Sequence, residues 1–200
     1  MPPEEKANEI SRRAVIASAA IVPVAALTAA AQQPAESALS AGQLRILEAF
    51  VDRIIPKDEL GPGAAESGVA VYINRSLSDY LAGEKAAFVE GLEATDAYAK
   101  RSHGRAFVEL TPDQQDAVLT AMDSGTAQGF ENSKAFFARA RRLTLEGMFG
   151  DPYYGGNKNF AGWDLIRYPG PRMATSPNDQ KIGEIAKPTH MSAYGPKYGH

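Results

Sequence analysis

The chain has 200 residues, a formal net charge of −3 and a hydrophobic content of 44%, which suits one globular domain with its own core. Because it contains no cysteine, the sequence excludes disulfides, thiolate metal sites, covalent haem attachment and a cysteine nucleophile. The three histidines, His103, His190 and His200, are never three or four positions apart, and no long basic block occurs, which argues against a histidine metal site and against nucleic acid.

Residues 1–31 have the pattern of an export signal. A polar start leads through Arg12 and Arg13 into an uncharged run over residues 14–31, and Ala29-Ala30-Ala31 offers a cleavage site. At ~1.5 Å per residue this run is also long enough for a retained membrane anchor. Its alanine content and Pro23 favour a cleaved signal. We predict a twin-arginine-type signal peptide and a periplasmic protein, with a retained anchor or a structural helix as alternatives.

The body of the chain has helical periodicity. Two capping boxes, Ser40 with Gln43 and Thr111 with Gln114, mark helix starts, and Pro56 ends the first helix. No segment alternates long enough to predict a strand. We expect an all-α bundle of about five helices, over residues 40–55, 69–80, 84–101, from 111 through Met122, and 133–149.

The character of the sequence changes at Gly150. Pro152 and the Gly155-Gly156-Asn157 run are incompatible with a continuing helix, so a long irregular loop rich in Gly, Pro and aromatic residues is expected. Residues 172–200 contain few large aliphatic side chains and are predicted to be extended or disordered unless a partner holds them. The predicted organisation is therefore a signal over 1–31, a linker over 32–39, a helical domain over 40–171 and a tail over 172–200.

Two separated blocks carry a resemblance to a known family. The first is Leu39–Ala64, continued by Glu66-Ser-Gly-Val69 and Tyr72-Ile-Asn74. The second begins with Glu146-Gly-Met-Phe-Gly-Asp-Pro-Tyr-Tyr-Gly-Gly-Asn157 and continues with Gly162-Trp-Asp-Leu-Ile-Arg-Tyr-Pro-Gly170. Over about residues 39–171 the sequence resembles the gluconate 2-dehydrogenase subunit 3 family. One departure is Arg167, where many relatives carry a small residue such as glycine.

The resemblance implies a non-catalytic small subunit that escorts and stabilises a dehydrogenase. The large subunit would be a flavoprotein of the glucose-methanol-choline type that oxidises a sugar, gluconate or a polyol at a CH–OH group. It would be carried across the membrane by the small subunit's twin-arginine peptide. FAD is then expected in that partner and haem c in a multihaem cytochrome c subunit of some complexes, with no cofactor in this chain. The residues alone leave open a stand-alone periplasmic hydrolase or sugar-binding protein.

We predict that the loop from Gly150 to Pro171 contacts the partner. Such a loop loses much conformational entropy when it is ordered, and docking against a large subunit would offset that loss. Trp163 is compatible with either a core residue or an interface anchor, and the resemblance favours the interface. The predicted interface residues are Met148, Phe149, Asp151, Pro152, Tyr154, Gly155, Gly156, Asn157, Gly162, Trp163, Ile166, Tyr168, Pro169 and Gly170.

Other polar residues have simpler interpretations. Asp151, Asn157, Asn159 and Asp164 could supply oxygen ligands to Ca²⁺, but their spacing does not match an EF-hand loop. The carboxylates of the Asp113–Asp116 segment lie at a predicted helix start, where acidic residues are favoured by the helix dipole rather than by acid–base chemistry. No catalytic or metal-binding residue is therefore predicted.

Overall fold

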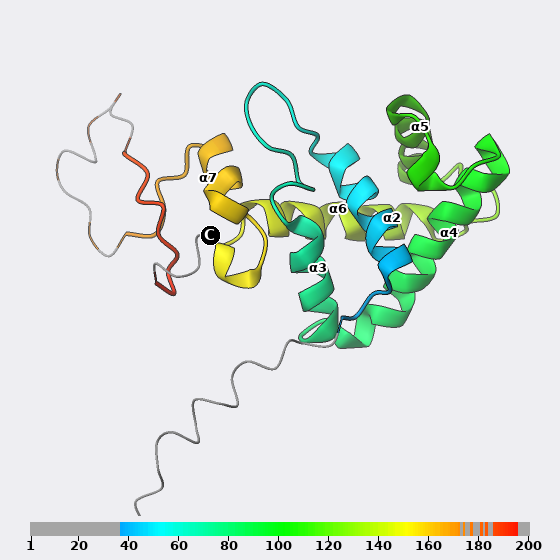
Figure 1. The fold of residues 1–200 in the computed structure, drawn as a ribbon, viewed down its shortest axis with the longest axis horizontal. Coiled ribbons are helices and arrows are strands. Elements are labelled where there is room, and N and C mark those ends of the chain that lie inside the picture. Colours follow the sequence, from blue (N-terminus) through cyan, green and yellow to red (C-terminus); the bar gives the residue numbers. More distant parts are fainter. Residues whose placement is uncertain are drawn as a thin grey trace, which may run out of the picture. The chain divides into compact units, whose positions relative to one another are not determined.

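The computed structural model describes residues 37–172, together with residues 174, 177, 181, 183 and 186–195. Within these residues the chain is helical and has no strand, as predicted (Figure 1). The predicted signal peptide, including Arg12 and Arg13, lies outside them. The α-helices are α2 (Ala41–Ile54), α3 (Val69–Ser78), α4 (Lys85–His103), α5 (Pro112–Ser124), α6 (Ser133–Phe149) and α7 (Ala161–Leu165).

Both predicted capping boxes are confirmed. The Ser40 hydroxyl accepts a hydrogen bond from the Gln43 backbone N–H at 3.3 Å, and the Gln43 side chain accepts one from the Ser40 N–H at 2.9 Å. Thr111 and Gln114 repeat this arrangement at the start of α5. Because each box satisfies two backbone donors that the first helical turn leaves unpaired, local sequence alone determines where these two helices begin.

Helix α3 is shorter than the helix predicted over residues 69–80. It ends at Ser78, and Asp79 has non-helical backbone angles, so Tyr80 does not continue the apolar face of α3. The backbone N–H of Leu81 turns back to the Ser76 carbonyl at 2.9 Å. Tyr80 is 61% exposed, and its hydroxyl lies 2.9 Å from the hydroxyl of Tyr72. The prediction that Tyr80 extends this helix, made from its helical spacing to Leu77, was therefore wrong.

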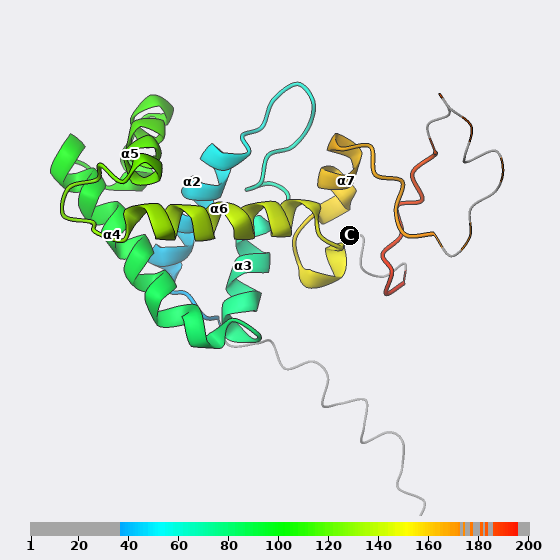
Figure 2. The ribbon, with the colours of Figure 1, turned by 180° about the vertical axis from the view of Figure 1, so that it is seen from behind.

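Helix α6 is the central element of the bundle. It packs against α2, α3, α4 and α5. Figure 2, which views the fold from behind, shows α6 running across these helices. The ring of Phe136 meets Phe88 edge-on at 5.3 Å and Phe50 at 6.1 Å. Gly91 of α4 lies directly beneath the Phe136 ring, where a Cβ would overlap it. The packing of the Phe136 ring against α4 therefore requires glycine at position 91.

The segment after α6 contains more helix than predicted. Two 3₁₀ turns, Pro152–Tyr154 and Lys158–Phe160, precede the five-residue helix α7, which lies beside the C-terminal end of α6 (Figure 1). Elements of three to five residues are too short for an apolar period to register in the sequence. In the part of the chain that the structure describes, no helix is both long and apolar enough to cross a bilayer.

Candidate functional site

The loop after α6 is closed on itself by Asn157. This side chain is fully buried, its Nδ2 donates to the Gly150 carbonyl at 2.8 Å, and its Oδ1 accepts from the Gly162 N–H at 2.8 Å. Asn157 also has a left-handed backbone with φ 48°, a conformation that asparagine tolerates better than most residues. One asparagine thus joins the end of α6 to the start of α7.

Trp163 also connects the loop to the end of α6. Its side chain is only 4% exposed, and its indole N–H donates to the Phe149 carbonyl at 3.0 Å. Its ring contacts Phe160 at 5.3 Å and meets Tyr168 edge-on at 5.0 Å. Of the two alternatives for Trp163, the structure supports an interior side chain over one that projects from the surface.

Described tail residues lie along the outer side of this loop. The Asp151 carboxylate accepts hydrogen bonds from the Ser192 hydroxyl at 2.6 Å and from the Ala193 N–H at 2.9 Å. His190 Nε2 lies 2.7 Å from an oxygen of Asp164. Residues 186–191 form neither helix nor strand, a turn follows at 192–195, and Thr189, His190, Ser192 and Ala193 of this segment hydrogen-bond to this chain's own loop.

Large side chains remain exposed on the loop and the tail. The ring of Tyr194 stacks on Tyr153 at 4.0 Å, and its hydroxyl lies 2.8 Å from that of Tyr154, a hydrogen bond that raises the pKa of Tyr154. Exposed aromatic and aliphatic side chains of this kind commonly anchor protein interfaces. The exposed members of this loop surface are Tyr153, Tyr154, Ile166, Tyr168, Met191 and Tyr194.

The predicted interface residues therefore fall into three groups by exposure. Tyr154, Ile166 and Tyr168 are 40–54% exposed and are available to a partner. The other predicted residues are covered, fully or in part, by this chain and maintain the shape of the loop. For example, Gly156 lies against Gly147 and Gly162 lies against the Met148 carbonyl, and neither position has room for a Cβ. The buried group is Met148, Pro152, Gly156, Asn157, Gly162, Trp163 and Gly170, and the half-buried group is Phe149, Asp151, Gly155 and Pro169.

A hollow of about 650 Å³ adjoins this loop, and we call it the α3–α6 hollow. On one wall, the Tyr72 hydroxyl donates to Glu146 at 3.2 Å. Burial, together with the hydrogen bond to Tyr80, raises the pKa of Tyr72, so its hydroxyl stays protonated. No sequence motif signalled that Tyr72, Tyr80 and Glu146 meet here. The lining residues are Tyr72, Tyr80, Leu145, Glu146, Phe149, Gly150, Asp151 and Tyr154.

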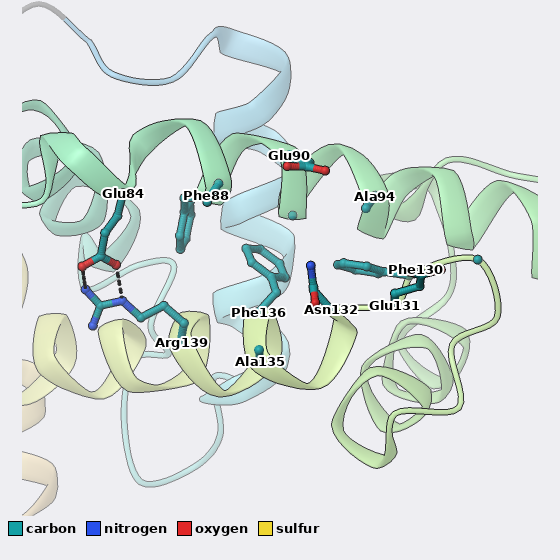
Figure 3. A pocket seen from close by; sticks show the side chains of 13 residues that line it. Glu84, Phe88, Glu90, Ala94, Phe130, Glu131, Asn132, Ala135, Phe136 and Arg139 are labelled. Carbon is teal, nitrogen blue, oxygen red and sulfur yellow. Dashed lines mark hydrogen bonds and ion pairs between the residues drawn. The ribbon is translucent and has the colours of Figure 1, made fainter.

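A second hollow, of about 510 Å³, lies between α4 and α6 (Figure 3). Its floor is apolar and includes Phe88, Phe130 and Phe136. At one end Arg139 is bound to Glu84 by two hydrogen bonds of 2.8 and 2.9 Å. We call this hollow the α4–α6 groove. Because it has a predominantly apolar floor and its one lining cation is already paired, it has the features of a packing groove rather than of a catalytic site.

The polar residues that the sequence analysis considered for acid–base chemistry or Ca²⁺ binding do not form a common site in the described structure. Asp116 forms a two-bond ion pair with Arg53 at 2.7 and 2.8 Å, and this contact lowers the pKa of Asp116. Asn157, one of the four oxygen-bearing residues considered for Ca²⁺, binds two backbone groups. Among the residues that the structure describes, no three His, Cys, Asp or Glu side chains are grouped to hold a metal ion.

One protein family matches both the helical bundle and the loop after α6. The model of the family described as gluconate 2-dehydrogenase subunit 3 matches residues 41–170. The chain belongs to the gluconate 2-dehydrogenase subunit 3 family. The match spans all six described helices and the closed loop, and therefore includes the Asn157 and Trp163 contacts. Comparisons with curated proteins and with solved structures gave no match.

Proposed function

We propose that this chain is the non-catalytic small subunit of a flavin-dependent dehydrogenase that oxidises a sugar, gluconate or a polyol. The observation that carries the proposal is the family match over residues 41–170. The large subunit, a flavoprotein of the glucose-methanol-choline type, would hold the FAD and the substrate pocket. In complexes with a multihaem cytochrome c subunit, that subunit would accept the electrons.

The proposed contact surface is the loop surface after α6. Its shape is set by buried hydrogen bonds of Asn157 and Trp163, so a partner would meet a surface that is already ordered. Preorganisation of this kind lowers the entropy cost of association. Tyr154, Ile166 and Tyr168 would contribute contact area, and the buried residues would contribute by holding these side chains in place.

The interface can be tested by substituting one exposed ring. Tyr154→Ala should weaken binding of the large subunit, and loss of an interface hot spot costs at least ~2 kcal/mol, or about thirtyfold in affinity. Val108→Ala, which removes an exposed apolar side chain in the short 3₁₀ turn Phe107–Glu109 before α5, is the control. Binding that is equal for wild type and both variants would remove the loop surface from the proposal.

The proposed escort role rests on the signal over residues 1–31. Replacing Arg12 and Arg13 together by lysine should leave both this chain and the flavoprotein in the cytoplasm, because the large subunit would have no export signal of its own. Fractionation followed by dehydrogenase assay measures the outcome. Normal periplasmic activity in the double variant would contradict the escort role, and would leave the role of this chain as a bound subunit to be tested separately.

A further inference from the structure

The α3–α6 hollow combines aromatic rings with two carboxylates, one of which, Asp151, has only neutral hydrogen-bond partners. Two of its lining residues, Glu146 and Asp151, carry carboxylates, and no lysine or arginine is among the described residues that line it. The aromatic part of the lining is Tyr72, Tyr80, Phe149 and Tyr154. Aromatic faces and carboxylates are the two kinds of group that attract an organic cation, through the ring quadrupole and through charge-assisted hydrogen bonds.

The Glu146 carboxylate is held by neighbours and retains acceptor capacity. It accepts a hydrogen bond from the Tyr72 hydroxyl at 3.2 Å and pairs with Arg142 at 2.8 Å. Because Tyr72 has only one hydroxyl proton and gives it to Glu146, Tyr80 must donate to Tyr72. A carboxylate offers about four acceptor positions, so two remain for a further donor. Arg142 is 72% exposed and lies outside the lining.

Asp151 is fixed in position by neutral partners. Its oxygens accept from the Tyr153 N–H at 2.9 Å, the Ser192 hydroxyl at 2.6 Å and the Ala193 N–H at 2.9 Å. These hydrogen bonds orient the carboxylate but do not neutralise its charge. Asp151 therefore contributes a negative charge beside the aromatic rings, and Glu146, although paired with Arg142, contributes further acceptor positions for a cationic donor.

We infer that the α3–α6 hollow receives a basic side chain, arginine or lysine, from the large subunit. This inference rests on the proposed function and specifies the chemistry of the contact. The hollow is continuous with the proposed interface, because Tyr154 lines it and is also bonded to Tyr194 on the loop surface. Its volume of about 650 Å³ accommodates the side chain and part of the segment that carries it.

The first test removes one charge without changing the shape of the side chain. Glu146→Gln should weaken binding of the purified large subunit by up to about fivefold, as expected for the loss of a partly exposed charged partner. The matched control is Glu90→Gln, which makes the same substitution on an exposed residue of the α4–α6 groove and should leave affinity unchanged. Affinity should also fall less steeply with added salt in Glu146→Gln than in wild type.

The second test separates the aromatic face from the hydroxyl. Tyr80 is 61% exposed, so its replacement should leave the helical circular dichroism unchanged. Tyr80→Phe keeps the ring and should retain most of the affinity, whereas Tyr80→Leu removes the π face and should lower affinity several-fold. Equal affinities for the two variants would contradict contact between a cation and this ring.

The outcomes distinguish the inference from the proposed function. If wild type binds the large subunit, and both Glu146→Gln and Tyr80→Leu bind it with the same affinity as wild type, the basic side chain lies elsewhere. In that case only the inference is wrong. If wild type does not bind the flavoprotein at all, both are wrong. If gluconate or glucose displaces the large subunit from wild type but not from Glu146→Gln, the hollow is a sugar site and the inference is also wrong.

Discussion

Asn157→Ala should release the loop after α6 while leaving the helical bundle folded. The asparagine side chain is the direct link between the Gly150 carbonyl and the Gly162 N–H, at 2.8 Å to each. Alanine cannot make either bond, and it also accepts the left-handed backbone at φ 48° less readily than asparagine. The loop should therefore open at lower denaturant concentration than in wild type.

The expected loss can be estimated term by term. Leaving the buried Gly162 N–H unpaired costs about 1–3 kcal/mol, and losing the bond to Gly150 costs about 1 kcal/mol. The left-handed conformation adds about 1 kcal/mol for alanine. The free energy of opening the loop should thus fall by about 3–5 kcal/mol. Asn157→Gly loses the same bonds but tolerates the backbone, so it should be about 1 kcal/mol less damaging than alanine.

The chain contains a built-in probe for this experiment. Trp163 is its single tryptophan, is buried in the loop and donates to the Phe149 carbonyl. Denaturation followed by Trp163 fluorescence reports on the loop, and circular dichroism reports on the helices. The fluorescence transition should move to lower denaturant in Asn157→Ala, while the dichroism transition of α2 to α6 moves less.

A matched control is Asn132→Ala. Asn132 is an exposed asparagine that precedes α6 and makes no capping bond with its side chain, so its loss should change stability by less than about 0.5 kcal/mol. If Asn157→Ala also stays within about 0.5 kcal/mol of wild type, the two buried hydrogen bonds do not hold the loop. If Asn157→Gly is no more stable than the alanine variant, the cost assigned to the left-handed backbone is wrong.

Three further substitutions test other parts of the structure. Arg167 has φ 55°, so Arg167→Gly should raise the free energy of unfolding by up to about 1 kcal/mol, measured from Trp163 fluorescence, and a decrease would refute this. Gly91→Ala should lower it by about 1–3 kcal/mol in thermal melts, because the new Cβ overlaps a Phe136 ring that is closely packed. The lowered pKa of Asp116 means that its carboxylate stabilises the fold above its unfolded pKa of about 3.9 and that this contribution is lost as the pH falls through the lower folded pKa. Asp116→Asn should therefore be less stable than wild type by under about 1 kcal/mol at about pH 7, with the difference shrinking as the pH falls below about 3.9, and a difference that does not shrink in acid would refute the assignment.

The helical bundle could be predicted because its determinants are local. Ser40 with Gln43 and Thr111 with Gln114 satisfy the first amides of two helices within four residues. Apolar residues at helical spacing then define the faces that meet Phe136. The exception is Tyr80, whose spacing fits α3 although Asp79 leaves the helical conformation before it. A favourable period cannot reveal such an early helix end when no Gly or Pro marks it.

The arrangement of the loop depended on contacts that no local pattern encodes. Asn157 reads in the sequence as a turn residue, and only the fold shows that its amide connects Gly150 to Gly162. The tail could not be placed either, because Ser192 and Asp151, which are 41 positions apart in the sequence, meet through ordinary polar side chains. Arg167 was expected from the sequence to depart from its relatives, and its positive φ of 55° is a physical reason why glycine would suit that site.

Purification of the native complex through a tag after His200 tests the central claim most directly. If the chain is the small subunit of a flavin-dependent dehydrogenase, it should retain a larger polypeptide with flavin absorbance and with sugar, gluconate or polyol dehydrogenase activity. The isolated small subunit should have neither the absorbance nor the activity. A colourless chain that is recovered alone from its native host, or one that converts a sugar without a partner, would contradict the claim.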